Sequence, residues 1–517
     1  MIKEIEIVVA PEDLNNEIVV KQLIISQLQI KASELNEFSI LKRSIDARSK
    51  KVVFRLKVKI ATLNDHIESK KLQFIYSDVS AQKEVYVIGA GPAGIFAALR
   101  LIELNLKPIV IERGKDVKER RRDLAALNKE LILNTESNYC FGEGGAGTYS
   151  DGKLYTRSTK RGDVDRILQR FIDHGADPDI AINTRPHIGT NKLPQIIQSL
   201  RNKIIECGGE FHFNTKLTDI EIESNKIKSI TLNHNVKINT SQLILATGHS
   251  ARDIYELLHR KNILIEAKPF ALGVRIEHPQ SIIDQVQYRC DTRPNELPPA
   301  YYNIVEQVNG KGVFSFCMCP GGIIAPCATN HNEVVVNGWS PSKRNNQFAN
   351  SGLVVQIDLS DIADATINPL AALNYQHAVE QLAYQHANNS IKAPAQRIVD
   401  FVNHKVSNDL PENSYLPGLT SANLHDVLPL HVSSRLKQAL PVFGKKMKGY
   451  FSNEGILVGV ESRTSSAVRI PRDRETLEHT QIKGLYPCAE GAGYAGGIVS
   501  AAIDGERCAE ALGLKRV

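Results

Sequence analysis

The first eighty residues alternate between apolar and polar positions in a way that predicts a small α/β module. Four runs carry the pattern, in chain order strand, helix, strand and strand: 2–10, 13–28, 37–48 and 52–60. This order is typical of a ferredoxin-like sandwich, which we expect over residues 1–80. The small and polar stretch 77–82 predicts a linker after it.

From Lys83 onward the pattern is that of a nucleotide-binding α/β fold. Residues 84–114 give a short apolar strand, a glycine turn, a helix and a second apolar strand. Further along, we expect a helix over 193–207 and two strands over 211–232 that turn at Ser224–Asn225. A short buried strand is expected over 242–248. Residues from about 455 return to a strand, glycine and helix pattern.

These elements predict a Rossmann-like domain that is interrupted by a long insertion. A chain of 517 residues is too long for one hydrophobic core, which agrees with several domains. We therefore expect an N-terminal ferredoxin-like module, an FAD/NAD(P)-binding domain in two segments, and an inserted α+β domain that covers the cofactor. The expected bounds, in chain order, are 1–80, 83–264, 265–450 and 451–517.

The strongest motif is Gly89-x-Gly91-x-x-Gly94, which follows the first apolar strand of this domain. Gly89 permits the tight turn, Gly91 lets the backbone approach a pyrophosphate, and Gly94 lets the helix pack against the sheet. The helix that starts near Pro92 offers free N–H groups and a partial positive charge to phosphates. Glu112 ends the next strand, where its carboxylate is expected to accept both ribose hydroxyls.

Three later segments favour FAD over NAD, because a longer ligand needs more than the first motif. They are a glycine-rich loop, Cys140–Asp151; the small residues Ala246-Thr247-Gly248 after a buried strand; and a strand, acid and glycine-started helix, 484–512. In the last segment, the helix N-terminus would stabilise negative charge on a reduced flavin. The predicted cofactor contacts are Gly89, Gly91, Pro92, Ala93, Gly94, Glu112, Arg113, Gly144, Gly145, Gly147, Thr148, Ala246, Thr247, Gly248, Glu490, Gly491, Gly496, Gly497 and Ile498.

The order of these segments resembles the glutathione-reductase-type FAD superfamily. More narrowly, the chain resembles a bacterial family of FAD-dependent dehydrogenase-like proteins, also described as NAD(FAD)-utilizing dehydrogenases. Six motifs carry this likeness: 44–48, 141–154, 316–326, 337–351, 461–473 and 490–505. The resemblance implies FAD and an oxidoreductase role, but no particular substrate. Glu490 stands where related flavoproteins often have Asp, and a second GxGxxG for NAD(P)H is not found.

Catalytic residues are not identified by the sequence, and three candidates are put forward. Arg463 and Glu461 precede the last FAD segment, where Arg463 could face the flavin or an anionic substrate, although a structural Arg–Glu pair explains both equally well. Arg275 lies on an expected strand of the insertion. His278, on that strand, is expected to be structural rather than a proton donor, and His249 after Ala-Thr-Gly stays ambiguous. Asn337, Arg344 and Asn350 could line a polar pocket, against a slightly favoured hydrogen-bonded loop.

The eight cysteines are scattered along the chain, so they do not indicate a disulfide framework. This distribution suits a protein in a reducing compartment. Cys317 and Cys319 could form a redox pair, but no base is visible beside them in the sequence, so buried structural thiols are favoured. Adding Cys327 gives three sulfur ligands without a fourth at sensible spacing. No metal is therefore predicted.

The net charge and the N-terminal sequence indicate which kinds of binding partner to expect. The net charge of +6 is scattered, and the one basic cluster, Lys118 with Arg120–Arg122, is better explained by a solvated helix face than by nucleic-acid binding. No secretory signal is found, and the uncharged stretch Val85–Leu99 is too short to span a bilayer and contains turn-forming glycines. We expect a cytoplasmic protein with a small-molecule substrate and no membrane partner.

The leading interpretation is an FAD-dependent oxidoreductase, a dehydrogenase or reductase, that acts on a small organic substrate. One alternative is a flavin-dependent tRNA-modifying enzyme, which would need a sustained basic surface. The other is a non-catalytic FAD-binding protein whose N-terminal module recruits a protein partner. A pocket without polar residues near the flavin would favour this last alternative.

Overall fold

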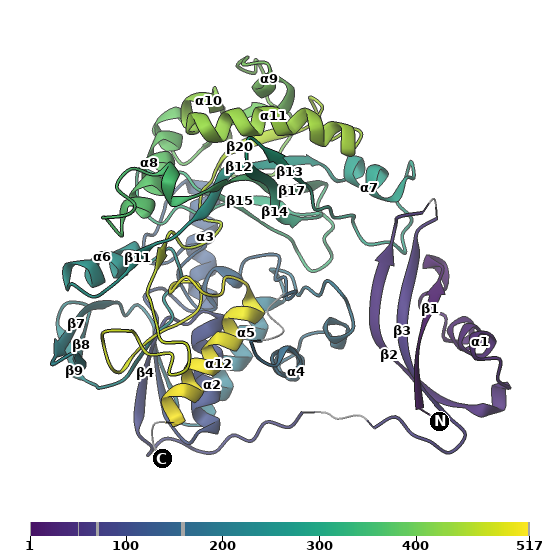
Figure 1. The fold of residues 1–517 in the computed structure, drawn as a ribbon, viewed down its shortest axis with the longest axis horizontal. Coiled ribbons are helices and arrows are strands. Elements are labelled where there is room, and N and C mark those ends of the chain that lie inside the picture. Colours follow the sequence, from purple (N-terminus) through teal and green to yellow (C-terminus); the bar gives the residue numbers. More distant parts are fainter. Residues whose placement is uncertain (1, 50, 69–71, 157–160, 515–517) are drawn as a thin grey trace.

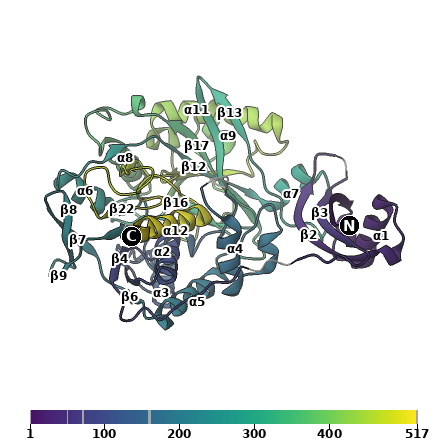
Figure 2. The ribbon, with the colours of Figure 1, turned by 60° about the horizontal axis from the view of Figure 1, so that its bottom comes forward.

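The computed structural model describes residues 2–49, 51–68, 72–156 and 161–514. Figure 1 shows a small module at one end of the molecule and two larger halves, one above the other. The module keeps this end position when the molecule is turned (Figure 2). Within the described residues, no helix has the length and apolar character needed to cross a bilayer.

The N-terminal module is a three-stranded antiparallel sheet with one helix. Its elements are β1 (Ile2–Val9), α1 (Glu17–Leu28), β2 (Leu35–Asp46) and β3 (Val53–Thr62), with strand order β1-β3-β2. This is the predicted order of elements, and it matches the first four elements, βαββ, of a ferredoxin-like arrangement. On β2, the backbone N–H of Arg43 donates to the carbonyl of Ile182 at 2.7 Å, which joins the module to the main body.

The lower half is built on a five-stranded parallel sheet of order β22-β10-β4-β5-β6. Its strands are β4 (Glu84–Ile88), β5 (Lys107–Ile111), β6 (Glu210–His212), β10 (Leu243–Leu245) and β22 (Leu485–Pro487). The accompanying elements are α2 (Pro92–Glu103), α3 (Val117–Glu130), α4 (Val164–Asp173), α5 (Leu193–Glu206), α6 (Arg252–Arg260), α12 (Ile498–Leu514) and a small sheet of β7 (Leu217–Glu223), β8 (Lys226–Leu232) and β9 (Val236–Asn239).

Two helices from opposite ends of this half pack together very closely. A Cβ placed on Gly505 of α12 would lie 2.0 Å from the carbonyl oxygen of Ala93 in α2, so only glycine fits there. This contact and the β10–β22 pairing bring the C-terminal segment back onto the sheet that begins with β4. The predicted α/β fold with a parallel sheet is confirmed.

The upper half is built on a seven-stranded sheet of order β13-β14-β17-β12-β20-β18-β19. Its strands are β12 (Phe270–Pro279), β13 (Val305–Val308), β14 (Lys311–Cys319), β17 (Phe348–Ile357), β18 (Ala393–Arg397), β19 (Leu419–Ser421) and β20 (Ile456–Glu461). The other elements are α7 (Gln280–Tyr288), α8 (Ala371–His386), α9 (Ile398–Val402), α10 (Leu424–Val427), α11 (Leu430–Lys446) and the pairs β15 (Ile323–Pro326) with β16 (Val336–Trp339) and β11 (Glu266–Ala267) with β21 (Val468–Arg469).

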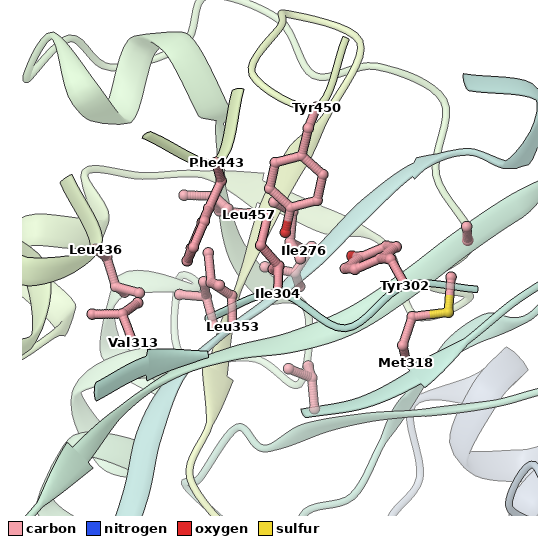
Figure 3. Close-up of a cluster of buried hydrophobic side chains, with 14 of the residues drawn as sticks. Ile276, Tyr302, Ile304, Val313, Met318, Leu353, Leu436, Phe443, Tyr450 and Leu457 are labelled. Atoms are coloured by element: carbon pink, nitrogen blue, oxygen red, sulfur yellow. The ribbon is translucent and has the colours of Figure 1, made fainter. Parts of the chain in front are cut away.

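Helix α11 lies over the outer face of this sheet, on the side away from the parallel sheet (Figure 1). Leu436 and Phe443 of α11 pack toward Val313, Leu353 and other apolar side chains of the strands in a continuous core (Figure 3). The opposite face is left to meet the lower half of the molecule.

Strand β20 corrects the predicted domain boundary at residues 450 and 451. It pairs with β12 and β18 in the seven-stranded sheet, so the chain returns to the parallel sheet only after Glu461. A short buried apolar strand has the same sequence pattern in either sheet, which is why the pattern did not reveal its place. With this change, the division into domains stays a prediction.

Buried Glu277 on β12 is expected to make stability depend on pH. Its carboxylate accepts from the backbone N–H of Ser414 at 2.8 Å and from the Ser414 hydroxyl, and burial raises the pKa of Glu277 to about 7. A raised folded-state pKa means that its stabilising contribution is present below about pH 4.3 and lost as the pH rises through about 7.

Glu277→Gln, which imitates the protonated acid, should therefore flatten the dependence of unfolding free energy on pH. Between pH 5 and pH 8 we expect wild type to lose about 2 to 3 kcal/mol more than the variant. Urea unfolding at several pH values measures this difference. If the unfolding free energies of the two proteins changed equally with pH, the raised pKa of Glu277 would be contradicted.

Candidate functional site

The glycines of the first motif satisfy steric demands within the fold. Gly89 follows β4 with a φ of 104°, and a Cβ there would lie 2.3 Å from the carbonyl oxygen of Ala246. A Cβ on Gly94 would lie 1.8 Å from the carbonyl oxygen of Gly89. Both positions therefore require glycine for the turn and the helix to pack, as the motif predicted.

Gly91 is different, because nothing in the protein crowds it. A Cβ there would meet only the Cα of Gly145, at an ordinary 3.8 Å. The residue is the N-cap of α2 and no side chain caps this helix end, so its first N–H groups are left for another acceptor. The open space beside Gly91 and the free N–H groups of α2 therefore lie at the place where the motif predicts a pyrophosphate.

The other predicted segments gather around this turn. The N–H of Gly144 donates to the carbonyl of Ala90 at 2.7 Å. A Cβ on Gly147 would lie 3.2 Å from the Ile498 side chain and 3.6 Å from that of Pro92, so three of the four segments meet there. A Cβ on Gly491 would lie 2.9 Å from the N and O atoms of Gly248, so the third segment joins the fourth.

The two acids of the cofactor motifs have protein partners of their own. Glu112 accepts from the backbone N–H groups of Ala90, Gly114 and Gly142, each at 2.9 Å, and so ties three loops together. Glu490 lies 3.0 Å from Nδ1 of His249, the histidine that the sequence left ambiguous. His249 and Glu490 thus form a pair between the third and fourth segments.

Two further predicted contacts, Arg113 and Thr148, are engaged within the protein. Arg113 forms ion pairs with Glu136 at 2.7 Å and Asp253 at 2.9 Å. The Thr148 hydroxyl donates to the carbonyl of Glu143 at 2.9 Å and is fully buried. Both side chains stabilise the loops around the glycine turn.

Arg120 corrects the expectation that the basic cluster is a solvated helix face. Lys118, Arg121 and Arg122 are exposed, but Arg120 is fully buried. Its guanidinium donates to the carbonyls of Asn138, Tyr139, Glu143 and Gly145, at 2.8 to 3.0 Å. The arginine therefore holds the glycine-rich loop in shape. This role was not predictable from the sequence, because buried arginines are rare.

Arg120→Met should loosen this loop and weaken FAD binding by roughly tenfold or more, since several buried carbonyls lose their donor. Arg122→Met is the matched control, because it removes an exposed arginine two residues away. Titration of each purified variant with FAD gives the affinities. Equal affinities for the two variants would show that the loop does not depend on Arg120.

A narrow cavity lies between the two halves, beside these segments. The lower half contributes Tyr139, Cys140 and His249, and the upper half contributes β16 residues, Glu461 and Arg463. Its free volume of ≈ 50 Å³ is small. The cavity brings two of the three catalytic candidates next to the His249–Glu490 pair.

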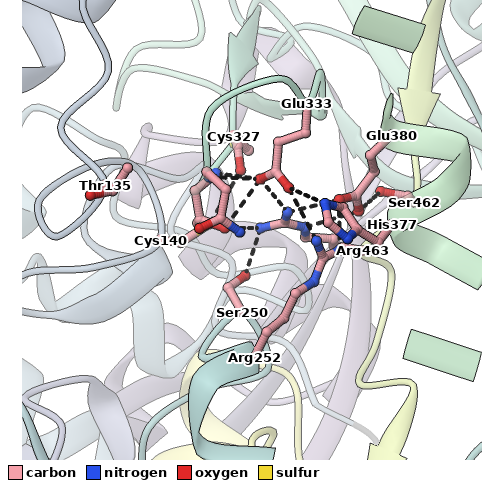
Figure 4. Close-up of polar contacts among 12 residues, drawn as sticks. Thr135, Cys140, Ser250, Arg252, Cys327, Glu333, His377, Glu380, Ser462 and Arg463 are labelled. Atoms are coloured by element: carbon pink, nitrogen blue, oxygen red, sulfur yellow. Dashed lines mark hydrogen bonds and ion pairs between the residues drawn. The ribbon is translucent and has the colours of Figure 1, made fainter. Parts of the chain in front are cut away.

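Arg463 belongs to a buried charge cluster that connects the halves (Figure 4). It pairs with Glu333 at 2.7 Å and Glu380 at 2.9 Å, and Arg252 of α6 pairs with the same two glutamates. The remaining donors go to Thr329 and Ser250, so all five guanidinium N–H groups are used. This arginine therefore positions the halves and keeps no donor for a ligand.

Arg275 is the second candidate, and it pairs with the third, Glu461. Arg275 is fully buried and lies 3.0 Å from Oε2 of Glu461, with further bonds to Asn350 and Asn337 at 2.8 and 3.4 Å. Burial raises the pKa of Glu461 to about 7, against the opposing charge of Arg275. Glu461 is thus a buried, cavity-lining acid that Arg275 holds in place.

Other residues singled out from the sequence are placed as follows. His278 is buried, with Nε2 2.7 Å from the carbonyl of Tyr450, and burial lowers its pKa to about 4, as expected of a structural histidine. Arg344 pairs with Asp151 at 2.6 Å instead of lining the cavity. Of the predicted polar trio, only Asn337 lines it.

Among the described residues, one group could offer three ligand atoms to a metal: Cys488, Asp504 and Cys508. Arg472 pairs with Asp504 at 2.6 Å and lies 3.5 Å from the Cys508 sulfur. A guanidinium in this position neutralises the carboxylate and disfavours a cation. The sequence did not single out this group.

The comparisons with known proteins identify the class. A family model described as FAD-dependent protein, C-terminal domain-like, matches residues 269–464, and a domain family of unknown function matches residues 1–61. The protein is thus FAD-dependent, and the predicted cofactor, FAD, is confirmed. The chain is 41% identical over 518 residues to an uncharacterized protein of Clostridium beijerinckii, with 96% of each chain covered. The chain belongs to the same family as that protein.

More distant likenesses are partial. A thiamine thiazole synthase of Aeropyrum pernix is 24% identical over 184 residues, which span 33% of this chain and 56% of that one. The structure of a geranylgeranyl bacteriochlorophyll reductase-like protein of Thermoplasma acidophilum has a TM-score of 0.35 at 12% identity, and covers 84% of this chain and 79% of that one. Neither likeness is strong enough to transfer a function.

Proposed function

We propose that the chain is an FAD-dependent oxidoreductase of the glutathione-reductase type that acts on a small organic substrate. The observation that carries this proposal is the convergence of four glycine segments, which begin at Gly89 and end at Ile498, beside a cavity with an ionisable acid. FAD, when bound, supplies hydride or electron transfer.

The residues present suit FAD in the predicted places. The uncapped start of α2 and the unhindered Gly91 suit the pyrophosphate, and Glu112 stands beside that turn for the ribose. Glu490 and the start of α12 at Ile498 suit the ribityl and flavin end. The cofactor contacts named from the sequence remain part of this proposal.

The polar cavity supports a catalytic role over mere FAD binding. Glu461 and His249 both line it, and Arg275 holds the Glu461 carboxyl in place from behind. An acid with a pKa of about 7 is suited to accept or return a proton as a substrate is oxidised or reduced. We therefore assign Glu461 as the candidate acid–base residue and Arg275 as its positioning residue.

Anaerobic reduction of the FAD-loaded protein tests the proposal. NADH and NADPH are added separately, followed by a library of small metabolites, while the visible flavin absorbance is recorded. Bleaching by any of these compounds supports an oxidoreductase and identifies its electron donor. A flavin that dithionite reduces, but that no nicotinamide and no metabolite reduces, would contradict the catalytic role.

A further inference from the structure

Cys317 and Cys319 lie on an irregular part of β14. The pairing of β14 with β17 shifts register between Phe316 and Cys319, and Cys317 has a φ of 45°, which is unusual for a residue other than glycine. The Cys319 thiol turns back and donates to the carbonyl of Cys317 at 3.3 Å. The bulge therefore brings the two cysteines together instead of spacing them as in a regular strand.

Two cations from other elements contact the pair: Lys153 contacts both sulfur atoms, and Arg275 contacts that of Cys319. Nζ of Lys153, at the end of the glycine-rich loop, lies 3.6 Å from Sγ of Cys317 and 3.7 Å from Sγ of Cys319. A guanidinium nitrogen of Arg275 lies 3.4 Å from Sγ of Cys319 and donates to the Cys317 carbonyl at 2.7 Å. Lys153 and Arg275 are far from the two cysteines in the chain, so the sequence, in which no base was visible beside them and buried structural thiols were favoured, did not reveal these contacts.

The two cysteines differ in exposure as the two members of a redox pair do. Cys317 is partly exposed and Cys319 is fully buried. Hydrogen bonding between the two thiol side chains, aided by the charges of Lys153 and Arg275, lowers the pKa of Cys317 well below its usual value, and the same interaction raises the pKa of Cys319. By contrast, burial raises the pKa of partly exposed Cys290.

The surrounding charge distinguishes redox chemistry from metal binding. Lys153 and Arg275 stabilise a thiolate but repel a metal cation, and the carboxylate beside Lys153, that of Asp151, is itself paired with Arg344. A partly exposed thiolate in an electropositive setting is the environment of reactive cysteines, whereas buried neutral thiols are inert. The cluster therefore favours nucleophilic attack on sulfur.

We propose that Cys317 and Cys319 form a redox-active dithiol whose reaction partner is a disulfide. The Cys317 thiolate attacks one sulfur of the partner, breaks its S–S bond and releases one thiolate. Cys319 then attacks Sγ of Cys317, forms the intramolecular S–S bond and releases the second thiol, which takes the Cys319 proton. The pair is oxidised by two electrons and the partner is reduced by two. This activity does not require FAD.

Oxidised glutathione is the probe for the reduced full-length chain. After acid quenching, free thiols are blocked with N-ethylmaleimide. The mass of the tryptic peptide 312–343 is then measured by mass spectrometry. We expect a peptide that is lighter by two hydrogens, because of the Cys317–Cys319 bond, and in which these two cysteines carry no N-ethylmaleimide. Cys327→Ser, which removes the third cysteine of this peptide, should retain the bond, and Cys317→Ser and Cys319→Ser should each abolish it.

Cys319→Ser should also trap glutathione on Cys317, because the resolving thiol is missing. A fully labelled pair at every glutathione concentration would overturn the proposal. The same conclusion would follow if Cys319→Ser captured no more glutathione at Cys317 than the wild-type chain captures at Cys290.

The role of Lys153 is tested by alkylation with iodoacetamide at pH 6. Cys317 should react about tenfold or more faster than Cys290 in the same sample, since an ordinary thiol is almost wholly protonated there. Lys153→Met should slow Cys317 specifically, and Lys153→Arg should restore most of the rate. Circular dichroism checks that both variants fold, and equal rates for Cys317 and Cys290 in a folded wild-type chain would overturn the thiolate assignment.

Discussion

Gly91→Ala should abolish tight FAD binding while leaving the chain folded. The added methyl group meets no protein atom closer than 3.8 Å, and the φ of −74° and ψ of −177° at this residue suit alanine. The methyl group would instead occupy the space through which a pyrophosphate approaches the backbone. We expect the Kd for FAD to rise by about 100-fold or more, which corresponds to about 2.7 kcal/mol.

Two further glycine variants make this result interpretable. Gly312→Ala adds the same methyl group on β14, where the nearest atom is 3.6 Å away, and should keep wild-type affinity. Gly94→Ala should destabilise the fold itself, because its Cβ would clash with the Gly89 carbonyl. FAD titration with circular dichroism separates the two effects. A folded Gly91→Ala protein with wild-type affinity would place the pyrophosphate elsewhere.

Arg463→Met should destabilise the contact between the two halves by about 3 to 5 kcal/mol, because it leaves buried carboxylates undercompensated. Burial alone would raise the pKa of Glu380, but the charges of Arg252 and Arg463 hold it well below the usual range. With Arg463 removed, Arg252 is the arginine that remains to neutralise Glu333 and Glu380. Thermal unfolding of the variant should therefore begin at a clearly lower temperature.

Lys237→Met is the matched control for this prediction. Lys237 forms a close ion pair with Glu221 on the small β7–β8–β9 sheet, where the Lys237 side chain is 59% exposed and that of Glu221 is 38% exposed. Removing such a surface pair should cost less than about 1 kcal/mol. If the two variants unfold at the same temperature, the Arg463 cluster does not hold the halves together.

The local elements of the fold were predictable because their patterns are local. Strand β4, the glycine turn, α2 and β5 follow from one stretch of thirty-one residues. The N-terminal module follows from the alternation of its strands and the helical spacing of residues 13–28. The assignment of β20 to the upper sheet was not predictable, because it depends on pairing with β12 and β18. Apolar alternation specifies a strand but not its neighbours.

The candidate site shows the same limit at the level of side chains. The glycines were recognisable because backbone geometry restricts them to one residue type. The partners of charged residues were not: Arg463 pairs with Glu333 and Glu380 instead of Glu461, and Arg120 lies inside a cluster expected at the surface. Such pairings join residues far apart in the chain, and composition does not reveal them.

The most direct test of the central claim is the flavin content of the purified full-length chain. Its visible absorbance spectrum is recorded before and after incubation with FAD and removal of the excess, and the released cofactor is identified by chromatography. We predict a flavin spectrum and one released FAD for each chain. A protein that is folded but shows no flavin absorbance, before or after incubation with FAD, would contradict the claim that these glycine segments form an FAD site.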